Sequence, residues 1–158
     1  MAEDYNNDRL LELGETVYTS QAGMLKGDKW IANKIPEVLS YCRKARIIML
    51  TNHPEGLWAN GTAGKIEDAD SESVTVCLER GNKVKVFRER HELLDGEGRP
   101  KIIFRQFPFQ LAYAITIHKS QGMTIDKVAV DMDGHFAPGM TYVAMSRCRS
   151  KEGLYLIK

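Results

Sequence analysis

The residues best suited to chemistry lie close together in the last third of the chain. The apolar run LAYAITI at 111–117 is followed directly by the polar run HKSQG at 118–122. An imidazole, an ammonium, a hydroxyl and an amide therefore precede a glycine, which lets a phosphate approach the backbone closely. Because open α/β sheets bind ligands at the carboxyl ends of their strands, we expect a buried strand at 111–117 with a ligand site at its end.

A second stretch, YVAMSRCR at 142–149, begins apolar and ends in basic groups. It is typical of a short helix with Arg147 and Arg149 near its end. A planar, permanently charged guanidinium is well suited to the charge that develops on a phosphoryl group. The alternative is a pair of surface arginines, because cations are favoured near a helix C-terminus in any case.

Both stretches resemble the last two signature motifs of the RecD/TraA-like and PIF-type ATP-dependent DNA helicases. This 5′-to-3′ group of the first helicase superfamily includes proteins like the exodeoxyribonuclease V alpha subunit. Its pattern runs roughly "PL-LAWAITIHKSQG-T" and then, about twenty-five residues on, "YVALSRC"; here Gln121 and Arg147 are 26 positions apart. Upstream, MLTN at 49–52 and WANGTAG at 58–64 are similar to the family's "VMLT-N…VNGT-G" segment. The resemblance covers nearly the whole chain and implies a role in DNA repair or recombination.

For ATP, the resemblance implies that Arg147 is the catalytic arginine finger and that Gln121 and Gly122 also contact the nucleotide. The finger would reach across a cleft to ATP held on a partner RecA-like domain. Gly122 is almost equally well explained as a turn glycine. Arg149 we expect to have no catalytic role.

For DNA, the resemblance implies that Thr116, His118, Lys119 and Ser120 contact a single strand. Hydroxyl, imidazole and ammonium groups can bind phosphate oxygens without reading sequence, which a translocating motor requires. For Thr116, a buried β-branched strand residue is an equal alternative. His118 has the competing interpretation of a satisfied interior histidine.

The chain lacks the elements that hold a nucleoside triphosphate. No G-x-x-x-x-G-K-[S/T] phosphate loop occurs, and no acidic pair follows an apolar strand as a magnesium site requires. We therefore expect ATP and Mg²⁺ to act in a longer parent protein, with the upstream phosphate-loop domain as partner, and neither to bind to this chain alone. Two alternatives stay open: a stand-alone nucleic-acid-binding module without motor activity, and a structural domain whose motifs have lost their role.

Strand patterns predict two architectures in one chain. Alternating residues at 73–78 and 83–87, joined by Arg80-Gly81-Asn82, indicate a hairpin, and Asn60-Gly61 indicates a turn. These strands and those at 45–51 and 102–104 suggest a small SH3-like β-barrel inserted at 43–106. The flanking segments, 1–42 and 107–158, are predicted to form a partial RecA-like parallel sheet with the P-loop NTPase fold, as a second motor domain.

Further elements are predicted outside the barrel. A helix turn at 7–13 would be capped by Asn7, and another helix would start near Pro36. A strand at 127–132, a helix at 138–149 and a strand at 153–157 would complete the parallel sheet.

Composition adds weaker expectations. The 158 residues are 43% hydrophobic with net charge +1, but 80–106 holds eight basic and four acidic residues, so a phosphate contact and a solvated charged face are equally good interpretations. The three cysteines and four histidines show no metal-ligand spacing, and no apolar run is long enough to cross a membrane. We expect a cytoplasmic protein without a metal site. Trp58 and Phe87 are expected in the barrel core, with base stacking as the alternative.

Overall fold

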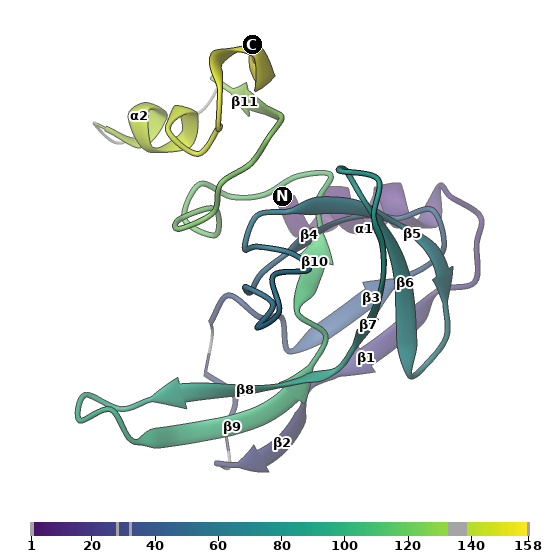
Figure 1. Ribbon diagram of the computed structural model, residues 1–158, viewed down its shortest axis with the longest axis vertical. Coiled ribbons are helices and arrows are strands. Elements are labelled where there is room, and N and C mark those ends of the chain that lie inside the picture. The colour runs from purple at the N-terminus through teal and green to yellow at the C-terminus, as the bar shows by residue number, and fades with distance from the viewer. Residues whose placement is uncertain (1, 28, 32, 133–138, 158) are drawn as a thin grey trace.

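Antiparallel β-structure makes up most of the regular structure, with a helix near each end of the chain (Figure 1). The computed structural model describes residues 2–27, 29–31, 33–132 and 139–157. The helices are α1 (Ala2–Leu11) and α2 (Met140–Met145), and a short 3-10 helix covers Lys151–Gly153. The strands are β1 (Tyr18–Gln21), β2 (Gly23–Lys26), β3 (Val38–Tyr41), β4 (Arg46–Met49), β5 (Ala63–Ala69), β6 (Ser73–Leu78), β7 (Lys83–Phe87), β8 (Glu89–Leu94), β9 (Pro100–Gln106), β10 (Phe109–Leu111), β11 (Val128–Asp131) and β12 (Leu154–Ile157).

The largest sheet has the strand order β10-β4-β5-β6-β7, with every neighbouring pair antiparallel. Strands β6 and β7 have the predicted bounds, and the hairpin through Gly81 is confirmed: Gly81 has φ +90° and the Leu78 amide donates to the Asn82 carbonyl at 2.9 Å. The predicted turn at Asn60-Gly61 is also confirmed, because the Thr62 amide donates to the Ala59 carbonyl at 3.0 Å.

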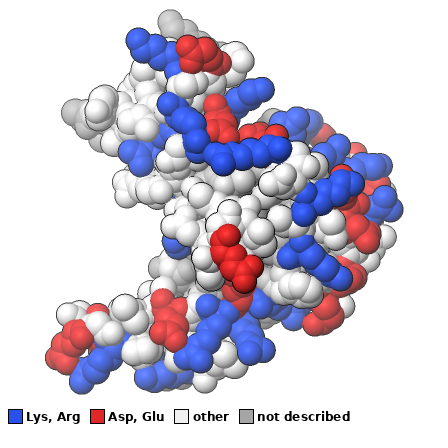
Figure 2. Space-filling view, in the orientation of Figure 1, with Lys and Arg blue, Asp and Glu red and all other residues white. Residues whose placement is uncertain are grey.

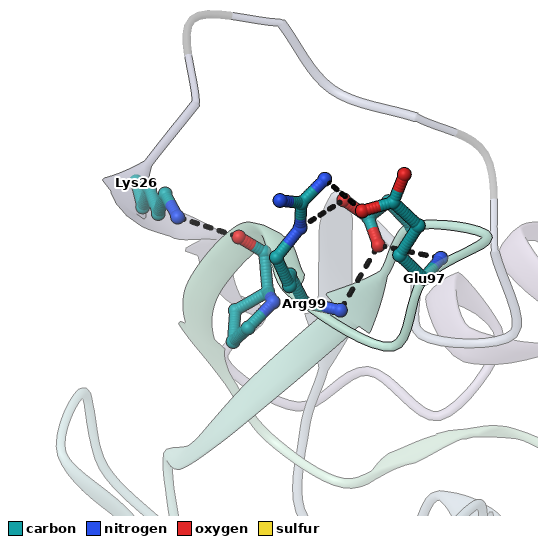
Figure 3. A network of polar contacts seen from close by, with 5 residues as sticks. Lys26, Glu97 and Arg99 are labelled. Atoms are coloured by element: carbon teal, nitrogen blue, oxygen red, sulfur yellow. Dashed lines mark hydrogen bonds and ion pairs between the residues drawn. The ribbon is translucent and has the colours of Figure 1, made fainter.

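A second sheet, β2-β9-β8, projects from the main body as a long hairpin (Figure 1). Charged groups close its tip (Figure 3): Arg99 forms ion pairs with Asp95 and Glu97, and the Lys26 ammonium of β2 donates to the Pro100 carbonyl at 2.6 Å. The Asp95 carboxylate also accepts two backbone N–H groups, which hold its pKa below the usual range. Part of the basic charge of 80–106 is therefore neutralised within the hairpin.

None of the sheets formed by the described strands closes into a barrel. The strands of 43–106 instead divide between two open sheets. Each sheet also takes a strand from outside that segment: β2 pairs with β9, and β10 pairs with β4. The insertion is thus joined to its flanking segments by backbone hydrogen bonds.

Strand β4 is buried on both faces and separates two hydrophobic clusters. Ile47 and Met49 belong to a cluster with β5, β6, β7 and α1, whereas Ile48 and Leu50 belong to one that contains Ile102 and Phe104. Alternate residues of a strand point to opposite faces, so one short apolar segment serves both clusters. Trp58 is 5% exposed in the first cluster, as expected, but Phe87 is 54% exposed, so its predicted burial is wrong.

The predicted strand at 111–117 is also wrong. Strand β10 ends at Leu111, and residues 112–117 contain no strand. Only the Ala112 amide continues the pairing, donating to the Arg46 carbonyl at 3.0 Å. Beyond it the backbone bonds to a side chain of α1 instead of to a neighbouring strand, so the apolar run does not enter a parallel sheet.

Two helix predictions near the N-terminus are corrected as well. Helix α1 begins at Ala2, so Asn7 lies inside it and is not its cap. Residues after Pro36 form β3, which pairs with β1 through Leu39↔Ser20 and Tyr41↔Tyr18. Leu39 and Tyr41 are buried in the structure. The segment forms a strand and not the predicted helix because β1 is available as a tertiary partner, which outweighs the local helical pattern.

The C-terminal unit is the parallel, α/β part of the chain (Figure 1). Strands β11 and β12 match the predicted strands and pair in parallel, with Val130↔Leu156 among the partners. Helix α2 is shorter than predicted, and position 138, where that prediction began, lies outside the described residues. In the described part of the chain, no helix is long and apolar enough to cross a membrane.

Candidate functional site

Residues 116–122 form a tight polar turn after β10. The Ser120 amide donates to the Thr116 carbonyl at 3.1 Å, and the Gln121 amide donates to the His118 carbonyl at 3.3 Å. Gly122 follows with φ +77°, a conformation that favours glycine. The predicted polar cluster therefore exists, but it lies on a turn rather than at the end of a strand.

The entrance to this turn is held by Asn6 of α1. Its side-chain oxygen accepts the amides of Tyr113 and Ala114 at 3.0 and 2.8 Å, and its amide nitrogen donates to the Ala114 carbonyl at 2.8 Å. These three bonds replace a strand partner for the backbone leading into the turn. Sequence reasoning missed Asn6, because nothing local distinguishes it from the other polar residues of α1.

The exit of the turn is held by the loop that precedes β5. The Asn60 side chain donates to the Gly122 carbonyl at 3.3 Å. Gly61 has φ +95°, and a Cβ placed there would lie 2.5 Å from the Thr124 carbonyl oxygen. Met123 and Ile125 then enter the hydrophobic cluster on one face of β4. The Asn60-Gly61 turn signal was visible in the sequence, but its contact with the polar turn was not.

The two motifs are joined directly by their backbones. Ile125 donates its amide to the Arg147 carbonyl and accepts the Arg149 amide, both at 2.9 Å. The Arg149 guanidinium forms an ion pair with Asp126 at 2.8 Å. Arg149 therefore has a structural partner in Asp126.

Arg147 is half-buried beside the end of α2. Its Nε donates to the Val143 carbonyl at 3.1 Å, and one terminal nitrogen donates to the Ser146 hydroxyl at 3.0 Å. A guanidinium has five N–H donors, so two are used and three remain without a partner among the described residues. The side chain is thus anchored to its helix and can still bind an anion.

Thr116 and Lys119 line a cavity of about 380 Å³ between the turn and α1. Glu3 and Asn6 of α1 and Leu39 of β3 form part of its wall. Thr116 is exposed, so the alternative interpretation of a buried strand residue is wrong. The cavity brings a hydroxyl and an ammonium together, as a phosphate contact requires.

The remaining predicted site residues differ in exposure and in the hydrogen bonds of their side chains. His118 and Gln121 are exposed and make no side-chain hydrogen bond within the described residues. Ser120 is 7% exposed, and its hydroxyl donates to the Ile117 carbonyl at 2.7 Å. The structure therefore brings 116–122 and Arg147 into one connected unit, with Ser120 turned inward.

Among the described residues, no group of three or more His, Cys, Asp or Glu side chains could hold a metal ion. Lys, Arg, Asp and Glu are interspersed over the face shown in Figure 2. The site offers the cations of Lys119 and Arg147 and neutral donors beside one carboxylate of the cavity wall, Glu3, and this excess of cations suits anionic ligands.

Comparison with known proteins identifies the origin of this arrangement. No protein-family model matches the chain. The chain is 37% identical over 161 residues to the ATP-dependent DNA helicase Pif1 of Bdellovibrio bacteriovorus, covering 99% of this chain and 37% of that protein. It is 34% identical to Pif1 of Campylobacter jejuni, with 94% of this chain and 38% of that protein covered.

Solved structures agree. Pif1 of Bacteroides sp in complex with ADP-AlF4 has a TM-score of 0.81 at 30% identity, covering 98% of this chain and 37% of that one. Bacteroides Pif1 bound to ssDNA has a TM-score of 0.70 at 30% identity and the same coverage. In sequence and in fold, the chain thus corresponds to a segment of the Pif1 helicases. The chain belongs to the PIF-type helicases and spans slightly more than a third of the length of these relatives.

Proposed function

We propose that this chain forms one wall of the motor cleft of an ATP-dependent DNA helicase. Arg147 acts as the arginine finger toward ATP, with Gln121 and Gly122 beside it. His118, Lys119 and Thr116 hold phosphates of single-stranded DNA, and Ser120 supports their turn from inside. The observation that carries the proposal is the backbone pairing of Ile125 with residues 147 and 149, because a displacement of the finger is then transmitted to the DNA-binding turn.

The nucleotide is held mainly by the rest of the parent protein. ATP bound with Mg²⁺ supplies the phosphoryl group whose charge the finger stabilises. Three unused donors on Arg147 fit that role, whereas no acidic cluster of the described chain fits Mg²⁺. The Bacteroides Pif1 complexes with ADP-AlF4 and with ssDNA support the same two ligands here. The upstream phosphate-loop domain is therefore the required partner, and this chain alone is not a catalyst.

The same proposal assigns the domains. Segments 1–42 and 107–158 belong to the second RecA-like domain, and 43–106 is an SH3-like insertion. Support for the insertion comes from the short antiparallel hairpins of β5 to β9, although β2 and β10 extend its sheets. The three cysteines are unpaired thiols, which fits the reducing cytoplasm.

The test uses the full-length parent enzyme. Arg147→Ala is expected to lower the ATPase kcat by roughly a thousandfold or more, with single-stranded DNA affinity nearly unchanged. Arg149→Ala is the matched control: it removes a neighbouring guanidinium that is paired with Asp126 and should retain turnover. Retained turnover in the Arg147 variant would refute the finger assignment.

A further inference from the structure

Phe87 is an aromatic residue in an unexpected place. It ends β7 and is 54% exposed, on the outward side that also carries Lys83 and Lys85. Two further exposed apolar side chains, Met24 and Leu25 of β2, are 37% and 57% exposed. Single exposed apolar residues are ordinary, but these three border one depression of the surface.

That depression, here called the β7–β2 groove, has a volume of about 400 Å³. Phe87, Met24 and Leu25 supply apolar walls, and Arg88, Arg105 and Glu72 also line it. The volume falls within the range of about 300 to 1,000 Å³ found for small-molecule sites. The groove is distinct from the cavity beside the polar turn, because the two share no lining residue.

Cations outnumber carboxylates around the groove. The Arg105 guanidinium makes no hydrogen bond or ion pair within the described residues, and Arg88 bonds only to the neutral Ser20 hydroxyl and Ser71 carbonyl. The Lys85 ammonium lies 5.6 Å from the centre of the Phe87 ring. Glu72 is the one carboxylate among the lining residues, so the groove attracts anions.

An aromatic ring beside uncompensated cations matches one ligand chemistry well. Single-stranded nucleic acid presents a flat base and a phosphate at every unit, and proteins bind it by stacking bases on aromatics within a basic groove. An extended peptide fits less well. It would have to add to the edge of β7, where Lys83 and Lys85 oppose strand pairing.

We propose that the β7–β2 groove is a second contact for single-stranded nucleic acid, with a base stacked on Phe87 and the adjoining phosphate held by Arg105. This proposal deepens the proposed function and rests on it in one respect: the nucleic-acid strand would be the same one that the turn at 116–122 binds. Figure 2 shows basic side chains gathered along the lower edge of the molecule, where Figure 1 places β2, β8 and β9.

The test measures binding of a fluorescein-labelled oligo(dT) to the 158-residue chain at several salt concentrations. Phe87→Ala is expected to weaken binding by roughly tenfold, the loss of one stacked base, and Phe87→Trp should restore it. Arg105→Gln should lower the slope of log K against log salt by about 0.7, the value for one single-strand phosphate. Tyr155→Ala is the control, because Tyr155 is also 55% exposed but lies on β12.

A second arm separates this contact from the proposed function. Ultraviolet cross-linking with iodouridine-substituted oligonucleotide should label the peptide that contains Phe87. Binding that weakens with Lys119→Ala but not with Phe87→Ala, with cross-links confined to 116–120, overturns the groove contact and leaves the proposed grip standing. Binding that weakens with Phe87→Ala but not with Lys119→Ala supports the groove and removes the proposed grip.

Discussion

Hydrogen bonding divides the side chains of the 116–122 turn into two groups. The hydroxyls of Thr116 and Ser120 bond to the turn itself: Thr116 accepts the Lys119 amide at 3.3 Å, and Ser120 donates to the Ile117 carbonyl. The side chains of His118 and Lys119 make no such bonds within the described part of the chain. In the proposed DNA contact, the imidazole and the ammonium are therefore the main phosphate ligands, while the Thr116 hydroxyl also bonds within the turn and the Ser120 hydroxyl supports it from inside.

His91 provides a pH-dependent test of packing. Its ring lies 5.2 Å from that of Phe104 and bonds the Gln106 carbonyl at 3.0 Å, and burial lowers its pKa below the ordinary value, with the nearby Lys34 charge acting in the same direction. The folded protein then binds fewer protons than the unfolded chain. Stability should therefore rise with pH, and it should be lost as pH falls below about 6.5.

The measurement compares the melting temperatures of the wild type and His91→Phe at pH 7.5 and pH 5. The wild type should lose more stability on acidification than the variant, whose ring cannot take up a proton. Glu89, whose pKa burial raises, titrates in the opposite sense but is present in both proteins. Equal losses in the two proteins would show that His91 is not the source of the dependence.

At the scale of elements, strand predictions were correct where the segment finds a strand partner, as in the hairpin β6–β7 and in the parallel pair β11–β12. Residues 73–78 and 83–87 alternate in polarity and are joined by a glycine turn, so the pattern and the pairing agree. The apolar run at 111–117 was predicted with equal clarity, but its backbone bonds to Asn6, more than 100 residues away. The candidate site residues were proposed from motifs, whereas their support by Asn6, Asn60 and Gly61 depends on contacts distant in sequence and could not be predicted from local pattern.

Gly61 allows this support to be tested. In Gly61→Ala the new Cβ meets the backbone of Thr124, so the turn at 116–124 must shift. Gly81→Ala is the control, because Gly81 has a similar φ of +90° and no neighbour within 4 Å of its added Cβ. The left-handed backbone alone should cost each variant about 1–2 kcal/mol.

The two variants are predicted to differ in stability and in their affinity for single-stranded DNA. Gly61→Ala should unfold at lower urea concentration than Gly81→Ala and should also bind oligo(dT) more weakly. Gly81→Ala should keep wild-type affinity, since its hairpin is closed by its own hydrogen bonds. Equal affinities in the two variants would mean that the loop before β5 does not position the polar turn.

At the scale of the whole molecule, a buried polar side chain lies along the chain between Phe104 of one hydrophobic cluster and Phe107 of the other. Gln106 is 0% exposed and ends β9. Its oxygen accepts the Ser20 hydroxyl at 2.6 Å and the Phe107 amide at 3.0 Å. Its nitrogen donates to the carbonyls of Ser20, Pro36 and Glu37 at 3.0 to 3.3 Å. One amide thus joins β1, the segment before β3 and the projecting hairpin.

Replacing the Gln106 amide with a carboxylate should destabilise both hydrophobic clusters without changing any residue of the candidate site. In Gln106→Glu an oxygen faces three carbonyl oxygens in place of a donor, which should cost about 3 kcal/mol or more. Gln110→Glu, at the half-buried position of β10, is the control. Because Gln106 bonds to strands that pack on both clusters, amides of β6 and of β9 should lose hydrogen-exchange protection together. Loss of hydrogen-exchange protection confined to β9 would instead show that the projecting sheet unfolds independently of the main sheet. The stability of the 116–122 turn would then depend on only one of the two clusters.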